Sequence, residues 1–378
     1  MAVGAIVVIE AESRRENSNG PGVDFADVNG AQNLADRPLA FLELLGRSTL
    51  ERTVERFAGA EVEAISVLAH WDVFPSMPPL RGSFENVAIM ASVDLGFQVA
   101  LALKDFAEKG IEHAFVVRPN VYCEADLGEM LACHRGGQAL MTRAADAEGA
   151  LDFWVVDCDA AWAPRISSWE EGMFGGMLRQ GSYFVNQYSK RISHPRDLRT
   201  LVVDAFSGRC PMRPSGKEVS PSVWMEEGAQ VYRGAQVAGP AFVGRACTIR
   251  ENTHVAGFSN VESCSYVDYG TSVEDATILS NTYVGIGLDV RSSVVQGNRL
   301  LNLTRDVVID VADPGLFHST VAEGMAGAAK LALMNLLNLT KTNPAEESPR
   351  DEVRQREMQE EECFTNIPVV NPRTEFES

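Results

Sequence analysis

Two apolar runs of this sequence are followed by polar residues at positions where a ligand could bind. Glu10 and Glu12 follow the run Val3–Ile9, and Asn120 follows a run that ends at Val117. If both runs are strands of a parallel sheet, their carboxyl ends lie at the same edge, where ligands of such sheets bind. The residues that decide function are therefore expected just after Ile9 and Val117.

A third apolar run ends in Asp157 and Asp159. Two carboxylates in this position could bind a metal ion, but no phosphate-binding segment is near them, and a surface turn is the favoured interpretation. The seven cysteines form no CxxC pair and share no spacing with the six histidines. The sequence therefore predicts no zinc site, because zinc ligands occur at characteristic short spacings.

The residues around these runs alternate between two periodicities. Continuous β-branched and apolar runs over 3–9, 64–68 and 114–117 predict strands that are buried on both faces. Helical spacing of apolar residues predicts helices over 50–57, 95–107 and 126–134. In the last of these, Asp126 is expected as the N-cap, with Glu129 completing a capping box. This alternation predicts βαβ units and a mainly parallel sheet.

A different pattern begins near residue 215, where one aliphatic residue or Met recurs at every sixth position. A small residue follows four positions later in nine of these ten repeats. Such a period predicts a solenoid with three short strands in each coil, in which the aliphatic residue fills the axis and the small residue fits the corner. A looser continuation runs through Leu279, Val284 and Val290. The spacing shortens from six residues to five between 279 and 284, and we call this change the slip. The ten positions are Val219, Met225, Val231, Val237, Val243, Ile249, Val255, Val261, Val267 and Val273.

The segments 5–15, 36–52 and 115–131, followed by these repeats, resemble the sugar-1-phosphate nucleotidyltransferases, also called nucleotide-sugar pyrophosphorylases. The resemblance implies an α/β fold with a Rossmann-like, GT-A-like nucleotidyltransferase domain. A left-handed parallel β-helix would follow it, and then a C-terminal helix with a disordered acidic tail. In that family a Gly-rich loop surrounds the nucleotide phosphates, a Lys binds phosphate, and an Asp binds Mg²⁺.

At these three motifs the sequence departs from the family. The Gly-rich loop is replaced by a segment without glycine in which only Arg15 matches; Arg37 stands in place of the Lys, and Asn120 in place of the metal-binding Asp. The resemblance thus implies Arg15, Arg37 and Asn120 as substrate-binding residues, with no catalytic residue assigned. Mg²⁺ is expected as a cofactor only if catalysis survives, since an amide is a poor substitute for a carboxylate ligand.

These departures lead to three hypotheses about function. The first is a nucleotidyltransferase-like protein of nucleotide-sugar or polysaccharide metabolism with lost or weakened pyrophosphorylase activity, acting as a regulatory or scaffold subunit. The second is an active sugar-1-phosphate nucleotidyltransferase with a rebuilt phosphate and Mg²⁺ site. The third is a hexapeptide-repeat acyltransferase, in which His254 would be the general base.

Composition restricts the partners. A net charge of −19 without a cluster of Lys and Arg disfavours nucleic acid, whose phosphates need a basic surface. No apolar stretch is long enough to predict a membrane span, and a cytoplasmic protein is expected. A nucleotide or a sugar phosphate is the expected small-molecule partner, and the repeats predict a homo-oligomer that assembles through the β-helix.

The patterns predict five segments. They are an α/β domain over 1–182, a helical linker over 183–214, the hexapeptide repeats over 215–300, a strand and C-terminal helix over 301–341, and an acidic disordered tail over 342–378.

Overall fold

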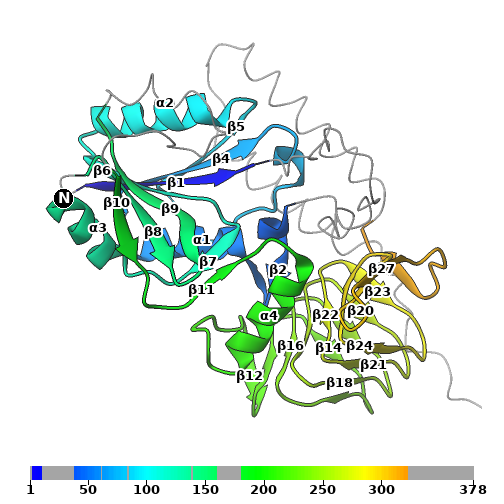
Figure 1. Ribbon diagram of the computed structural model, residues 1–378. Helices are drawn as coiled ribbons and strands as arrows, with labels where there is room; N and C mark the ends of the chain where they lie inside the picture. Colours follow the sequence, from blue (N-terminus) through cyan, green and yellow to red (C-terminus); the bar gives the residue numbers. More distant parts are fainter. Residues whose placement is uncertain are drawn as a thin grey trace, which may run out of the picture. The chain divides into compact units, whose positions relative to one another are not determined.

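The computed structural model describes residues 2–10, 38–60, 62–82, 85–137, 139–159 and 180–321. Within these ranges the chain has a mixed α/β fold (Figure 1): a seven-stranded sheet in the first half, and sheets of eight, five and four mostly short strands in the second. The expected C-terminal helix and the acidic tail lie outside the described residues.

The seven-stranded sheet has the order β10-β8-β9-β6-β1-β4-β5. Strands β1, β4, β5 and β6 are parallel, as the alternating pattern predicts. Strand β9 is antiparallel to both of its neighbours, so the sheet is mixed. The first residues of β9 therefore lie beside the last residues of β6, at the edge where ligands of parallel sheets bind. The strands are β1 Val3–Ile9, β4 Ala64–His70, β5 Val87–Ser92, β6 His113–Val117, β8 Met141–Asp146, β9 Gly149–Asp157 and β10 Gln180–Phe184.

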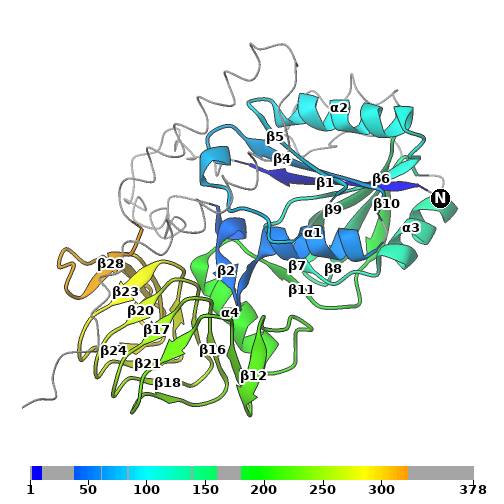
Figure 2. The same cartoon turned by 180° about the vertical axis from the view of Figure 1, so that it is seen from behind.

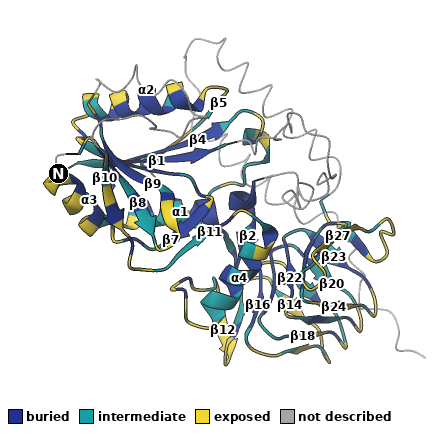
Figure 3. Ribbon diagram, in the orientation of Figure 1, coloured by how far each residue is buried: buried dark blue, intermediate teal, exposed yellow. Residues whose placement is uncertain are grey.

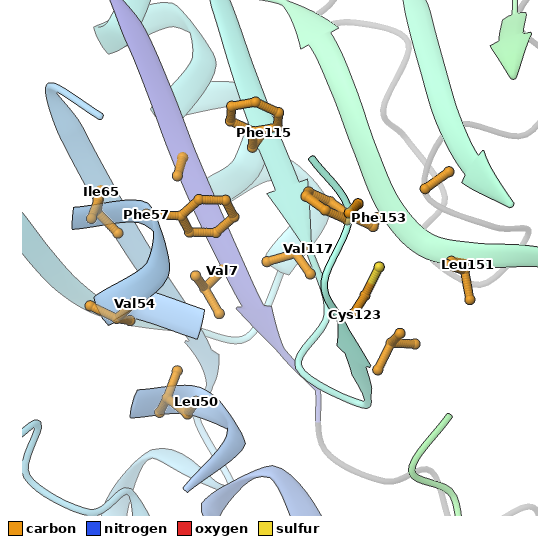
Figure 4. Close-up of a cluster of buried hydrophobic side chains, with 14 of the residues drawn as sticks. Val7, Leu50, Val54, Phe57, Ile65, Phe115, Val117, Cys123, Leu151 and Phe153 are labelled. Carbon is orange, nitrogen blue, oxygen red and sulfur yellow. The ribbon is translucent and has the colours of Figure 1, made fainter. Parts of the chain in front are cut away.

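Helices cover both faces of this sheet, with α2 on one side and α1 and α3 on the other (Figures 1 and 2). Along β1, Ala5, Val7 and Ile9 face α1, whereas Ile6 and Val8 face α2, which explains why this run is apolar without alternation. Figure 3 shows β1, β4 and β6 buried along most of their length. In Figure 4 the α1 side chains Leu50, Val54 and Phe57 lie among those of the sheet. The helices are α1 Thr49–Gly59, α2 Leu95–Glu108, α3 Leu127–Gly136 and α4 Pro195–Phe206.

Side-chain caps determine where the first three helices begin. Ser48 and Glu51 form a reciprocal capping box at α1, and Asp94 caps α2. Asp126 caps α3 as predicted, since its Oδ1 accepts from Glu129 N at 2.9 Å. The Glu129 carboxylate, expected to complete that box, instead accepts a hydrogen bond from Tyr183 Oη at 3.2 Å, so the prediction of a capping box is wrong. The predicted strands and helices of this domain are thus confirmed within a few residues.

Residues 183–214, expected as a helical linker, start inside strand β10, because this strand extends to Phe184. Tyr183 is buried in the core of the seven-stranded sheet. Strand β11 (Ser189–Arg191) then pairs with β7 (Val121–Cys123), and α4 follows. The helical part of this expectation therefore begins only at Pro195.

The repeat region forms three sheets of mostly parallel strands, and neighbouring parallel strands of one sheet are separated by one full coil of chain. Gln230 pairs with Thr248, and Thr248 with Tyr266, an offset of eighteen residues each time, as three strands of six residues require. We refer to the whole stack, β13 through β25, as the coil. One repeat of three strands within it is a single coil of the stack. The strands of the whole stack are β13 Val223–Met225, β14 Gln230–Val231, β15 Gln236–Val237, β16 Ala241–Val243, β17 Thr248–Ile249, β18 His254–Ala256, β19 Ser259–Val261, β20 Tyr266–Val267, β21 Ser272–Glu274, β22 Thr277–Ile278, β23 Thr282–Val284, β24 Asp289–Arg291 and β25 Ser293–Gln296.

Antiparallel strands flank both ends of the coil. Before it, β12 pairs with β13; after it, β26 pairs with β25 and β27 with β26, and β28 pairs with β23. The strands are β12 Lys217–Ser220, β26 Arg299–Asn302, β27 Val307–Asp310 and β28 Phe317–Ser319.

The ten residues at six-residue spacing, which we call the ladder, are completely buried in the axis only from the fifth one, Val243, onward. Residues from Val243 to Val273 at this spacing are completely buried, whereas Val219 is 57% and Val231 37% exposed. Val219 lies in the antiparallel strand β12 and outside the coil. Val231 belongs to the first coil of the stack, so only one neighbouring coil can cover it. Met225 and Val237 are partly buried and pack against the axial cluster, so the expectation holds in part for these two positions. It is wrong for Val219 and Val231.

The small residues of the ladder have a second role that their size alone does not predict. Hydroxyls at these buried corners donate to carbonyl oxygens of the next coil: Thr253 to Asp268 O at 3.0 Å, Ser265 to Leu279 O at 3.0 Å, and Thr271 to Gly285 O at 2.5 Å. Each of these bonds gives a backbone carbonyl oxygen a hydroxyl donor from the preceding coil. Successive coils are thus joined at the corners as well as through the strands.

The five-residue slip lies earlier than expected, between Val273 and Ile278. Val261 pairs with Ile278, an offset of seventeen, and Ile278 is the buried axial residue of that coil. Leu279, which the pattern placed in the axis, packs instead in a cluster with residues of α4. A corner formed by two left-handed residues, Gly257 and Phe258, is replaced one coil later by Asp275 alone. The shorter corner makes this coil one residue shorter, seventeen residues in place of eighteen.

Removing one corner hydroxyl should destabilise the coil. In Ser265→Ala, Leu279 O and Thr282 N would both lose the partner that Ser265 Oγ provides. We expect the free energy of unfolding to fall by about 1 to 2 kcal/mol, because two buried backbone groups become unpaired. Ser272→Ala, on a half-buried strand position, is the control and should change it by less than about 0.5 kcal/mol. If denaturant titrations gave the same loss of unfolding free energy for Ser265→Ala and Ser272→Ala, the corner hydroxyl would not stabilise the coil.

The short hairpin β2 (Glu43–Leu44) and β3 (Arg47–Ser48) contacts the coil through its turn. Leu45 and Gly46 both have positive φ, and their N–H groups donate to the carboxylate of Glu262 at 2.7 and 2.9 Å. Glu262 is completely buried and also accepts from Asn260 Nδ2 at 2.6 Å. Consecutive N–H groups in such a turn form an anion-binding concavity, which a side chain of the coil occupies here.

Candidate functional site

A charged cluster lies at the edge of the seven-stranded sheet where β1 and β6 end. Glu10 follows β1, Arg118 follows β6, and Asp152 is near the start of the antiparallel strand β9. Arg118 Nη2 lies 2.9 Å from Glu10 Oε1, and Arg118 Nη1 lies 3.5 Å from Asp152 Oδ2. The guanidinium group thus connects two carboxylates from separate strands. We call Glu10, Arg118, Asn120, Arg143 and Asp152 the carboxyl-edge cluster.

Asp152 is the centre of this cluster. Asn120 Nδ2 donates to its Oδ2 at 3.1 Å, and Arg143 Nη2 donates to its Oδ1 at 3.0 Å. The Arg143 guanidinium also lies over the Trp154 ring, 5.1 Å from the ring centre, which limits its orientation. Both carboxylate oxygens of Asp152 therefore have cationic or amide partners within the protein.

The electrostatics of the cluster favour internal pairing over binding of an added anion. Two guanidinium groups face two carboxylates, so the formal charges of the four residues cancel. Burial raises the pKa of Glu10, and the nearby Arg118 partly offsets this shift. A phosphate group would have to compete with Glu10 and Asp152 for the same guanidinium groups. A cation such as Mg²⁺ would compete with those guanidinium groups for the same carboxylates.

The structure locates one of the three residues that the resemblance implied as substrate-binding. Asn120 is exposed at the carboxyl edge and is hydrogen-bonded to Asp152. Arg15 and Arg37 lie outside the described residues. Glu10 and Asn120 were expected at this edge from the strand pattern. Arg118, Arg143 and Asp152 were not singled out, because the antiparallel direction of β9 has no simple sequence signal.

His254, the alternative general base, is an exposed residue of β18 on the outside of the coil. Among the residues that the structure describes, no side-chain hydrogen bond to its ring is found. A histidine base needs a second group that fixes its tautomer and direction. The geometry around His254 therefore gives no support to acyl-transfer chemistry.

A second polar cluster lies at the opposite edge of the sheet, where Asp157 was expected to be part of a surface turn. Asp157 instead ends β9, and its Oδ1 is 2.9 Å from His113 Nδ1 and 3.0 Å from His134 Nε2. Sequence inspection missed this cluster because its residues are widely spaced in the chain. Only the pairing of β6 with β9 and the packing of α3 bring them together.

A cavity of about 380 Å³ is lined by α1, β7 and residues 211–213. Three arginines line it, and two of them bind backbone carbonyls: Arg52 contacts Leu44 O at 2.9 Å, and Arg56 contacts Cys123 O and Ala125 O. These cations hold β7 and the β2–β3 hairpin against α1. Their structural contacts explain their presence without a ligand.

The fold and these clusters define a mixed α/β protein with a polar, internally paired carboxyl edge and a coil of stacked parallel strands. No protein-family model matches the chain, and no curated protein is similar to it in sequence. Over the described residues, no helix is both long and apolar enough to cross a membrane.

Proposed function

We propose that this protein is a nucleotidyltransferase-like subunit of nucleotide-sugar or polysaccharide metabolism in which pyrophosphorylase activity is lost or greatly weakened. Its first domain would be Rossmann-like and GT-A-like, and its coil a left-handed parallel β-helix. The observation that carries the proposal is the position of Arg118, whose guanidinium lies between Glu10 and Asp152 at the carboxyl ends of β1 and β6. Without pyrophosphorylase activity, the protein would act as a regulatory or scaffold subunit.

Nucleotidyl transfer needs cationic groups and a metal ion that remain available to phosphate oxygens. Catalysis of phosphoryl chemistry depends almost entirely on positioning and on neutralising the charge of the phosphates. In the carboxyl-edge cluster the cations already face protein carboxylates, and the amide of Asn120 donates to Asp152. Glu10 adds negative charge where the resemblance would place phosphate. All of these features disfavour nucleotidyl transfer.

A scaffold role is supported by the outer surface of the sheet formed by β14, β17, β20 and β23. Tyr266 and Tyr283 stack with ring centres 5.7 Å apart, and Arg250 lies 4.9 Å from the ring centre of Tyr232. Arg250 Nη1 also donates to Tyr266 Oη at 3.1 Å. Tyr and Arg are enriched in protein interfaces, and this row of side chains is ordered by its own contacts. We propose this surface as the contact for self-association.

The test is a pyrophosphorylase assay on the full chain. Purified protein, a panel of sugar 1-phosphates, each NTP in turn and Mg²⁺ should yield no nucleotide-sugar or pyrophosphate above the enzyme-free blank. Asn120→Asp, which restores a carboxylate, should remain inactive because Arg118 still pairs with Glu10 and Asp152. Formation of a nucleotide-sugar by the wild-type protein would reject the proposal and favour an active enzyme with a rebuilt site.

Two measurements separate a regulator from a scaffold. Light scattering gives the molecular mass in solution, and a monomer would argue against assembly through the coil. Thermal unfolding is then followed with UTP, GTP, dTTP and sugar phosphates. A rise in the unfolding midpoint without turnover would indicate a nucleotide-sensing regulator, and no change with any ligand would indicate a scaffold.

A further inference from the structure

We propose that His113, His134 and Asp157 form a binding site for a divalent transition-metal ion, with Zn²⁺ the best match. Their three ligand atoms lie within 4.8 Å of one another, and Asp157 Oδ1 is 2.9 Å and 3.0 Å from the two histidine nitrogens. Ligand atoms of a tetrahedral Zn²⁺ site are about 3.3 Å apart, as bond lengths of about 2.0 to 2.1 Å require. The site is independent of the function proposed above, since it lies at the other edge of the sheet.

Regular secondary structure positions all three ligands. His113 is the first residue of β6 and Asp157 the last of β9, and the two are directly paired in the antiparallel register. His134 lies in the last turn of α3, which packs against β8 and β9. The two imidazole rings are perpendicular, with centres 5.3 Å apart. Ligands on such elements are held more precisely than ligands on loops.

A neighbouring hydroxyl controls the orientation of His134. Thr142 Oγ1 lies 2.9 Å from His134 Nδ1, and both side chains are buried. If Nδ1–H donates to this hydroxyl, the Nε2 lone pair points toward Asp157 Oδ1 and is available to a metal. Metal-binding histidines commonly use their second nitrogen in this way.

The ligand set indicates the class of metal. Two imidazoles and one carboxylate suit Zn²⁺ and other first-row divalent ions, whereas Mg²⁺ and Ca²⁺ prefer oxygen ligands. The side chains of His113 and Asp157 are 14% and 28% exposed, so an ion can enter from solvent and keep a water molecule as fourth ligand. Two neutral histidines and one carboxylate together carry a charge of −1. A bound divalent cation would give the site a net charge of +1.

In a metal-free alternative, each of the two histidines is in its other neutral tautomer. Both histidines could instead donate N–H groups to Asp157, with Thr142 donating to His134 Nδ1. These hydrogen bonds satisfy the same atoms, so geometry alone allows both states. Metal titration distinguishes them, because only the first state binds an ion at a defined stoichiometry.

The experiment uses the full chain after dialysis against a chelator. Calorimetric titration with Zn²⁺ should show one equivalent bound, and Co²⁺ should produce visible absorption bands typical of a four-coordinate ion. His113→Asn and Asp157→Asn should each weaken Zn²⁺ binding at least tenfold, and Thr142→Val about tenfold, as expected for loss of a supporting hydrogen bond. Circular dichroism and unfolding midpoints without metal establish whether each variant is folded.

His70→Asn is the matched control. His70, in β4, lies 3.5 Å from the carboxylate of Asp72 and belongs to no cluster of three ligands among the described residues. Its replacement should leave Zn²⁺ affinity unchanged. The proposal is overturned if the wild-type protein binds neither ion stoichiometrically, which would leave a hydrogen-bonded cluster only. It is also overturned if the folded ligand variants bind Zn²⁺ as tightly as the wild type.

Discussion

Replacing Glu262 by alanine is expected to lower the free energy of unfolding by about 3 kcal/mol at pH 5. Its carboxyl group is completely buried and is the partner of the Leu45 and Gly46 N–H groups and of Asn260 Nδ2. Removing it leaves buried donors unpaired, and each such donor costs about 1 to 3 kcal/mol. The hairpin β2–β3 should also lose its attachment to the coil. Denaturant unfolding followed by circular dichroism measures the loss.

The size of this effect should depend on pH. Burial raises the pKa of Glu262 from 4.5 to about 7, although its three donors oppose the shift. Between these two values the folded state binds more protons than the unfolded state, so this group makes the wild type less stable as pH rises. Each pKa unit corresponds to about 1.4 kcal/mol. The free energy of unfolding of the wild type, relative to that of Glu262→Gln, should therefore fall by about 3 kcal/mol from pH 4.5 to pH 8.

Glu227→Ala is the control for both measurements. Glu227 is exposed on the coil, and replacing it should change stability by less than about 0.5 kcal/mol at either pH. If the wild type gained stability relative to Glu262→Gln as pH rises, the raised pKa would be wrong. If Glu262→Ala were as stable as Glu227→Ala at pH 5, the contact with the hairpin would contribute nothing.

Arg118→Met should produce the second large loss of stability, about 2 kcal/mol at pH 8. The substitution keeps an apolar stem of similar length but leaves Glu10 and Asp152 without the cation that connects them. Breaking a fully buried ion pair costs about 3 to 5 kcal/mol, and partial exposure of these groups reduces that value. Thermal and denaturant unfolding of the variant measure the loss.

The loss should be smaller at pH 5 than at pH 8. Burial already raises the pKa of Glu10, and Arg118 opposes this shift, so removing Arg118 raises the pKa further. A proton can then neutralise Glu10 in the folded variant at lower pH, which recovers part of the stability.

Arg291→Met is the matched control, because Arg291 also contacts two carboxylates, those of Glu274 and Asp289. Its side chain is 61% exposed, however. It should change stability by less than about 0.5 kcal/mol. A loss in Arg118→Met that matches this control at both pH values would contradict the role assigned to the carboxyl-edge cluster.

Local patterns in the sequence predicted most of the secondary structure. The apolar run Val3–Ile9 indicated a strand buried on both faces, and β1 has this environment. Asp126 indicated the start of α3, since the N-cap bond involves residues only three positions apart. The same patterns misplaced the slip in the coil. Ile278 and Leu279 are both buried, and only strand pairing distinguishes the axial residue from the one that contacts α4.

By itself, the sequence of this protein determined where strands, helices and coil would form, because periodicity and capping depend on neighbours within a few residues. Only the tertiary structure decided which polar groups meet. The antiparallel direction of β9 brings Asp152 to Arg118 at one edge of the sheet and Asp157 to His113 at the other. Glu262 binds a turn more than 200 residues earlier in the chain. Such contacts depend on the three-dimensional order of the strands, which no local spacing encodes.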